Sequence, residues 1–326
     1  MCISAASGPL SEPKVPVTGA KIPLDGSPGS PSVTNMNEIV VGVDGSEHAL
    51  VAVDWAAEEA HRRAASLRVV HVMVPWPLDI PVDPRVVAVW EGQVNTGEGQ
   101  QVVDEGLQRA RRRVPDLRVA GERSSGQPAA TLIEAAENAA MLVVGSRGTG
   151  ALAEVLLGSV ALQVASHARC PAVAVPAVGP EVHGEIVVGV DGSPAGAAAV
   201  RFAFEEAELR QARLRAVLAW THPASTRPGD MQPLVFDPEI VAAEERRLLS
   251  ESLAGWREKH PDVTVVPEVT RARATRALAA ASERADLLIV GSRGRGGFTG
   301  LLLGSVGHAM LHRAHCPVAV IRPHTN

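Results

Sequence analysis

The chain has 326 residues, of which 46% are hydrophobic and 21% are charged, and its formal net charge is -5 at pH 7. This length leaves room for two domains of ordinary size, each with its own hydrophobic core. A weak negative charge spread over the whole chain creates no general attraction for DNA, RNA or anionic lipid, so we expect no nucleic-acid partner. No apolar run approaches the ~20 residues of a membrane span, so none is expected.

The beginning of the chain differs in composition from the rest. Residues 1–35 are dense in Pro, Gly and Ser and contain no apolar run of the signal-peptide kind, so we expect a disordered tail. Met36 stands directly before the first apolar run and is an alternative start of translation. The three cysteines, Cys2, Cys170 and Cys316, are odd in number and far apart, which favours a reducing compartment and predicts a cytoplasmic protein.

The rest of the chain contains an internal repeat. EIVVGVDGS occurs at 38–46 and again at 185–193, and the segments VGSRG and LLGSV recur in the same order in both halves. Colinear matches of this kind indicate two copies of one domain. We assign the first domain to 36–177 and the second to 185–324, with a short polar linker between them.

Within each copy, short Val-rich runs alternate with longer Ala-rich amphipathic stretches. In the first copy the runs IVVGV, LRVVHVMV, MLVV and PAVAV predict buried strands, LRVAGER at 117–123 predicts one more, and helices are expected over 47–65, 99–113, 127–140 and 159–169. The alternation predicts an α/β fold: two tandem doubly wound parallel sheets of five strands each, with helices on both faces. Ligands of such sheets bind beyond the carboxyl ends of the strands, near the point where the strand order reverses.

A glycine-rich loop follows the fourth strand of each copy. Both loops read Gly-x-x-Gly, nine residues and Gly-Ser; their residues are Gly145, Gly148, Gly158 and Ser159 in the first copy and Gly291, Gly294, Gly304 and Ser305 in the second. Glycines let backbone N–H groups approach a phosphate, and the Gly-Ser pair opens a helix whose dipole favours an anion. The alternative is that these glycines only form turns, although their duplication favours the phosphate site.

Two further pairs of residues fit a nucleotide site. Asp44 and Asp191 end the first strand of each copy, where a carboxylate can accept hydrogen bonds from a ribose or a base, or cap the next helix. Arg147 and Arg293 in the glycine loops either contribute positive charge to a phosphate site or are solvated loop residues in surface ion pairs.

These motifs together resemble the tandem, ATP-binding form of the universal stress protein family, as found in actinobacteria. VVGVDGS opens the domain, GSRG is followed after nine residues by GSV, and a CP-containing strand closes it; the resemblance covers 38–322. It implies a Rossmann-like, adenine nucleotide alpha hydrolase-like fold that binds ATP, with Mg²⁺ as the accompanying ion. The implied binding residues in the first copy are Val43, Asp44, Val72, Gly145, Arg147, Gly148, Gly158, Ser159 and Val160, and in the second Val190, Asp191, Ala219, Gly291, Arg293, Gly294, Gly304, Ser305 and Val306.

The second copy departs from the family pattern. It reads RARATRAL where the first copy reads SGQPAATL, which makes the adenine end of its site different. The first copy has Ala140 where the second has Asp286. The second loop also carries Arg295 and two further glycines, which would strengthen its hold on phosphate.

Other groups of residues have simpler explanations. His308 and His312 share a helix face, with His315 nearby, but no carboxylate or cysteine motif completes a metal site, so we expect no metal. No Walker A loop and no dinucleotide-binding motif follows the first strand, which excludes the classical NTPase and dehydrogenase classes.

We therefore expect an ATP-binding regulator of a stress or dormancy response, with one nucleotide site in each domain and no catalytic residues. The alternative is an enzyme, a slow ATPase or an autokinase. This alternative is less favoured, because Glu154, the only acidic residue of the first glycine loop, is expected to face solvent. The other alternative is a protein-interaction scaffold that does not depend on nucleotide.

The last strands of the two copies, PAVAVP and PVAVIRP, are candidates to pair with each other as a pseudo-dimer. The helix faces are available for unidentified protein partners or a homodimer of chains.

Overall fold

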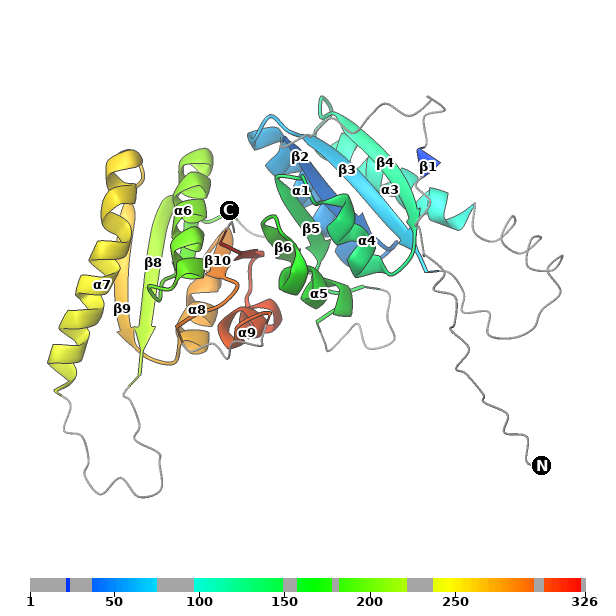
Figure 1. Cartoon of the computed structure of the whole chain (residues 1–326). Helices are drawn as coiled ribbons and strands as arrows, with labels where there is room; N and C mark the ends of the chain where they lie inside the picture. The colour runs from blue at the N-terminus through cyan, green and yellow to red at the C-terminus, as the bar shows by residue number, and fades with distance from the viewer. Residues whose placement is uncertain are drawn as a thin grey trace, which may run out of the picture.

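The computed structural model describes residues 22–23, 37–74, 97–148, 157–177, 182–221, 237–295 and 302–323. Several expectations fall outside these ranges: the tail apart from Ile22–Pro23, Met36, Glu154 and most of the linker. The described part of the chain forms two halves that lie side by side (Figure 1).

The first half contains the predicted order of strands and helices. Its elements are β2 (Glu38–Val43), α1 (Glu47–Arg62), β3 (Ser66–Met73), α3 (Glu98–Arg113), β4 (Val119–Ser125), α4 (Pro128–Ala135), β5 (Met141–Gly145), α5 (Ser159–His167) and β6 (Ala172–Val175). The helix expected over 127–140 is shorter, because α4 ends at Ala135 and a turn leads into β5. A two-residue strand, β1 (Ile22–Pro23), pairs antiparallel with β4.

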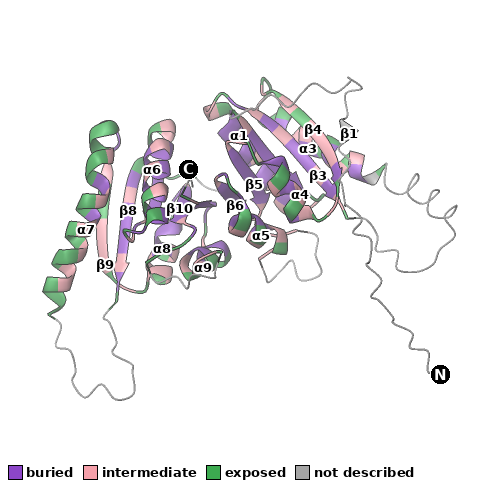
Figure 2. Ribbon diagram, in the orientation of Figure 1, coloured by how far each residue is buried: buried purple, intermediate pink, exposed green. Residues whose placement is uncertain are grey.

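The second half repeats this order. Its elements are β7 (Glu185–Gly189), α6 (Pro194–Arg210), β8 (Arg213–Trp220), α7 (Pro238–Lys259), β9 (Val265–Arg271), α8 (Ala274–Ser282), β10 (Leu287–Gly291), α9 (Ser305–Arg313) and β11 (Val318–Ile321). The central strands β2, β5, β6, β7, β10 and β11 are almost wholly buried between helices on both faces, whereas the outer strands are partly exposed, as Figure 2 shows. This is the sequence signature of a parallel sheet covered on both sides.

The strand order confirms the doubly wound fold. It is β1-β4-β3-β2-β5-β6-β11-β10-β7-β8-β9, and within each half all neighbouring strands after β1 are parallel. Strand β2 lies in the middle of the first five-stranded unit, and β7 lies in the middle of the second. The order therefore reverses between β2 and β5 and between β7 and β10, and these two points are the expected ligand positions.

The two five-stranded units are not separate sheets. Strands β6 and β11 pair antiparallel, with Val318 opposite Ala174 and Val320 opposite Ala172, so one continuous sheet runs through the molecule. This is the pairing of the last strands that the sequence suggested. It removes two exposed sheet edges at once.

A buried cluster of charges joins the halves on one face of this sheet. It consists of Glu59 and Arg63 of α1 with Glu206 and Arg210 of α6, and both glutamate side chains are 0% exposed. Each arginine bonds the glutamate of its own half and the glutamate of the other half. The two carboxylates and two guanidinium groups balance, as burial requires.

Candidate functional site

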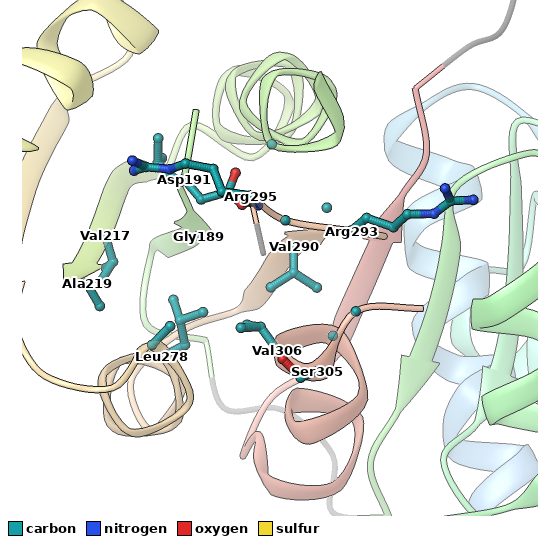
Figure 3. A pocket seen from close by; sticks show the side chains of 17 residues that line it. Gly189, Asp191, Val217, Ala219, Leu278, Val290, Arg293, Arg295, Ser305 and Val306 are labelled. Atoms are coloured by element: carbon teal, nitrogen blue, oxygen red, sulfur yellow. Dashed lines mark hydrogen bonds between the residues drawn. The ribbon is translucent and has the colours of Figure 1, made fainter. Parts of the chain in front are cut away.

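The candidate site of the second half lies at the predicted reversal point. A cavity of about 410 Å³ opens where β7 and β10 end, between the glycine loop and the first turns of α8 and α9 (Figure 3). Its lining residues are Gly189, Val190, Asp191, Gly196, Val217, Ala219, Ala274, Leu278, Val290, Gly291, Arg293, Gly294, Arg295, Gly304, Ser305, Val306 and Gly307. All nine residues predicted for the second copy are among them, so the structure brings these residues together around one space.

Asp191 organises the rim of this cavity. Its Oδ1 accepts hydrogen bonds from the backbone N–H and the hydroxyl of Ser193, at 3.0 and 2.7 Å, and its Oδ2 accepts one from the N–H of Arg295 at 3.0 Å. The Ser193 hydroxyl in turn accepts from the N–H of Gly196 and caps α6. Asp191 thus orients the capping serine and ties the glycine loop to the first strand, instead of capping the helix itself.

The first turn of α9 forms the opposite wall. Gly304 is the N-cap, with φ -72° and ψ 159°, and no side chain of the described residues caps this end. Its own N–H donates to the carbonyl of Ser292 at 2.7 Å. The N–H groups of Ser305, Val306 and Gly307 belong to the first turn and have no acceptor within the helix, so this end of the cavity carries the partial positive charge of the helix dipole.

The glycines of the loop have different functions. A Cβ at Gly291 would lie 2.7 Å from the backbone carbonyl carbon of Ala195, so this glycine permits close packing of β10 on the start of α6. Gly145 has the same relation to His48, with 2.9 Å to its carbonyl oxygen. At Gly294 a Cβ would lie 2.5 Å from Oδ2 of Asp191. A backbone neighbour lies on the Cβ side of Gly145 and of Gly291, so close packing accounts for these two glycines, and their function in binding phosphate stays a prediction.

The arginines of the second loop do not point into the cavity. Figure 3 shows the Arg293 side chain extending from the loop towards the first half. Burial and the neighbouring charge of Arg293 lower the pKa of Arg322 at the end of β11. Arg295 bonds Glu245 of α7 at 3.1 Å. Both arginines line the cavity, but the Arg293 side chain extends towards the other half and the Arg295 guanidinium contacts Glu245.

The first half repeats the same framework where it is described. Oδ1 of Asp44 accepts from the N–H and hydroxyl of Ser46, at 3.0 and 2.6 Å, and Ser46 caps α1. Gly158 donates to the carbonyl of Ser146 at 2.8 Å and opens α5 with no side-chain cap among the described residues. Predicted Val43 and Val72 are buried at the strand ends; Arg147, Gly148 and Val160 are half-buried, and Ser159 is exposed. The loop between Gly148 and Leu157 lies outside the described ranges.

Sequence reasoning missed the apolar floor of the second cavity. Val217, Leu278 and Val290 line it from β8, α8 and β10. For Val217 and Val290 a signal was present, because both are apolar residues on strands whose carboxyl ends lead to the reversal point, whereas Leu278 lies on α8.

The other candidate groups are the neighbouring histidines of α9 and the two cysteines before the last strands. The rings of His308 and His312 lie 4.9 Å apart, and burial, His308 and Arg313 together lower the pKa of His312. No group of three or more metal-ligating side chains occurs in the part of the chain that the structure describes. Cys170 and Cys316 are buried, unpaired thiols. None of the described helices is long and apolar enough to cross a membrane.

A duplicated α/β unit with an acidic residue after its first strand and a glycine loop after its fourth defines a class of doubly wound proteins with two reversal-point sites. Comparison with known proteins identifies the family. The sequence model of the universal stress protein family matches residues 36–176 and 184–322, so the chain belongs to this family of stress-response proteins and contains two of its domains.

Individual relatives agree with this assignment. The universal stress protein Rv2005c of Mycobacterium tuberculosis is 40% identical over 296 residues, which are 87% of this chain and 96% of that protein. A universal stress protein of Mycolicibacterium smegmatis is 39% identical over 293 residues, 87% of this chain and 97% of the relative. The crystal structure of a universal stress protein from Archaeoglobus fulgidus shares the fold, with a TM-score of 0.62 at 19% identity over 89% of this chain and 97% of that one.

Proposed function

We propose that each half of the chain binds one molecule of ATP, and that occupancy regulates a stress or dormancy response. One observation carries the proposal: a cavity of about 410 Å³ at the reversal point of the second half is surrounded by a glycine loop, an aspartate at a strand end and a helix N-terminus that no side chain of the described residues caps. The same framework of Asp44, Ser46 and Gly158 supports a second site in the first half.

The cavity offers separate surfaces for the parts of a nucleotide. Val190, Val217 and Leu278 form an apolar surface that suits a purine ring. The first turn of α9, from Ser305 to Gly307, supplies backbone N–H groups for phosphate oxygens. Asp191 retains further acceptor capacity for a ribose hydroxyl, because each carboxylate oxygen accepts more than one hydrogen bond. Mg²⁺ would accompany the triphosphate as its counterion.

These residues favour binding over turnover. None of the residues that line the second cavity is a histidine or a glutamate, and the one carboxylate, Asp191, already holds Ser193 and the loop. A carboxylate that already accepts these hydrogen bonds is poorly placed to activate water. A bound ligand would instead stabilise the glycine loop and the helix that follows it, a change that a protein partner or a second chain can recognise. We expect this regulator to act in the cytoplasm.

A substitution at the helix N-cap tests this proposal. Gly304 has extended backbone angles that any residue adopts, and a Cβ there would lie 3.4 Å from Cα of Arg293, so Asp fits with little strain. Asp is a favourable N-cap residue, so Gly304→Asp should preserve or raise stability while its carboxylate occupies the anion position and repels phosphate. Gly158→Asp is the same change in the first half, and Gly304→Ala is the uncharged control.

The measurement is the nucleotide released on denaturing purified protein, together with the melting temperature with and without Mg-ATP. We expect about two adenine nucleotides per wild-type chain, about one in Gly304→Asp and almost none in the double Asp variant, with the Ala control close to wild type. If the wild type releases no nucleotide and ATP leaves its melting temperature unchanged, the scaffold function replaces the proposal. ATP hydrolysis abolished by the double Asp variant would replace it with the enzyme function.

A further inference from the structure

Helix α9 carries two histidines that face each other one turn apart. His308 and His312 are exposed, and the centroids of their imidazole rings lie 4.9 Å apart, with the ring planes tilted by 43°. A spacing of four residues places both side chains on one face of a helix, one above the other. The pair lies on the outer side of α9, since Gly307, Met310 and Leu311 are the buried residues of this helix.

Neither ring of this histidine pair forms a hydrogen bond with another described residue. Other histidines of the chain differ in this respect. Nδ1 of His71 donates to the carbonyl of Val43 at 2.9 Å, and Nδ1 of His260 lies 2.9 Å from Oε2 of Glu208. Those rings have a structural function in the fold, whereas the two rings of the pair are held beside each other with their nitrogens available to a ligand from solution.

Two imidazoles at this helical spacing can hold one transition-metal ion, because both side chains reach the same point above the helix surface. Imidazole nitrogen suits Zn²⁺, Cu²⁺ and Ni²⁺, whereas Mg²⁺ and Ca²⁺ prefer oxygen ligands. We propose that His308 and His312 together bind one divalent transition-metal ion of the Zn²⁺ class, with water in its remaining coordination positions. This site is separate from the proposed nucleotide sites and does not depend on them.

The charges around the pair permit a bound cation. His312 and Arg313 lie in the last turn of α9, where the carbonyl end of the helix dipole favours positive charge and offsets the guanidinium of Arg313. Burial, His308 and Arg313 lower the pKa of His312, so its ring is mainly neutral at pH 7. Neutral imidazole is the form that binds a metal ion.

The internal repeat provides a comparison within the same molecule. Leu162 and Ser166 of α5 stand at the positions of His308 and His312, so the pair belongs to the second half alone. A group of three or more metal-ligating side chains is absent from the described residues. A site with two protein ligands therefore differs from a closed structural zinc site, because most of the coordination positions of its ion stay open to exchange.

A bound ion would act on the helix that carries it. His308 lies one turn after Gly304, the N-cap of α9, and its backbone N–H donates to the carbonyl of Gly304 at 3.0 Å. An ion held by both histidines would join two successive turns of α9. Because it binds the folded helix and not the unfolded chain, it should stabilise the protein.

Titration calorimetry with Zn²⁺ tests the proposal on a Cys2→Ser chain, which lacks a competing thiol ligand. We expect saturable binding at the pair and no displacement of Zn²⁺ by Mg²⁺. His308→Ala and His312→Ser, the second copying Ser166, should each weaken Zn²⁺ binding by about tenfold or more, because each removes one of two linked ligands. Both side chains are exposed, so the melting temperature without metal should stay unchanged, and Zn²⁺ should raise it only in the chain with both histidines.

Chemical modification locates the ion. Zn²⁺ should protect His308 and His312 from diethylpyrocarbonate, while His315, which is exposed in the turn after α9, should stay reactive. His315→Ala is the matched control and should bind Zn²⁺ as the parent chain does. No saturable binding of Zn²⁺, an affinity unchanged in both His308→Ala and His312→Ser, or an equal loss in His315→Ala would overturn the proposal.

Discussion

Nη2 of Arg210 in α6 lies 2.5 Å from Oε2 of Glu59 in α1, and Arg63 makes the reciprocal contact with Glu206. Each guanidinium also lies over an aromatic ring of the opposite half: Arg63 over Phe202 at 5.7 Å and Arg210 over Trp55 at 5.6 Å. Burial would raise the pKa of Glu59, but Arg210 and Arg63 outweigh it and hold that pKa below its usual value. The two halves are thus joined by a cluster in which each glutamate contacts both arginines, and Glu59 also contacts Arg62 of its own helix at 3.4 Å.

The first prediction concerns this cluster. Glu59→Met leaves two buried arginines facing one glutamate and should lower the free energy of unfolding by about 3 kcal/mol. The double variant Glu59→Met, Arg210→Met keeps the direct contact of Arg63 with Glu206 and restores the charge balance, so it should be more stable than the single variant. Urea unfolding measures the free energy of unfolding of the single and the double variant. A double variant less stable than the single one would show that the charges do not act as a balanced set.

The sequence allowed prediction of the repeats, the fold class and the residues that gather around the second cavity. These follow from local patterns, because Val-rich runs become buried parallel strands and the topology brings their carboxyl ends together. The charge cluster was not predicted. Glu59 and Glu206 lie on helices whose polar residues are mostly solvated, and only the contact between the halves buries these two.

The glycine loop shows the same limit. Its spacing predicted a backbone site, and the helix N-termini at Gly158 and Gly304 agree with that prediction. The sequence did not show which glycines of the loop are also required by internal packing, as Gly291 is against Ala195. Nor did it show that Arg293 extends towards the other half, since side-chain direction depends on neighbours far away in the sequence.

The second prediction separates these two kinds of glycine. Gly291→Ala should destabilise the protein by about 1 to 3 kcal/mol with or without ligand, because the new Cβ meets the backbone of Ala195, which has little freedom to move. Gly304→Ala should change stability by less than about 0.5 kcal/mol. Thermal melting of both variants without nucleotide tests this, and equal stability of the two would contradict the packing explanation.

The third prediction concerns the connection between Asp191 and the glycine loop. Asp191→Ala removes the acceptors of Ser193 and of the Arg295 N–H, so we expect a loss of about 1 to 2 kcal/mol. The amide of Arg295 should exchange its hydrogen faster, while amides of the central strands β10 and β11 should keep their protection. Hydrogen exchange read by mass spectrometry of the loop peptide checks this. Unchanged exchange at Arg295 would mean that the loop is held by other contacts.

The last prediction concerns the two buried thiols, which occupy equivalent positions before the final strand of each half. Burial raises the pKa of Cys170 to about 11 and that of Cys316 to about 12. At pH 8 the reactive thiolate is therefore at most about one part in a thousand at either residue, and burial also restricts access of a reagent. In a Cys2→Ser chain, iodoacetamide should leave both cysteines unmodified for as long as the protein is folded and alkylate both in denaturant. Because a raised pKa keeps the thiol protonated, labelling should increase only at strongly alkaline pH; rapid labelling of folded protein at pH 8 would show that one thiol is a reactive site and not part of the core.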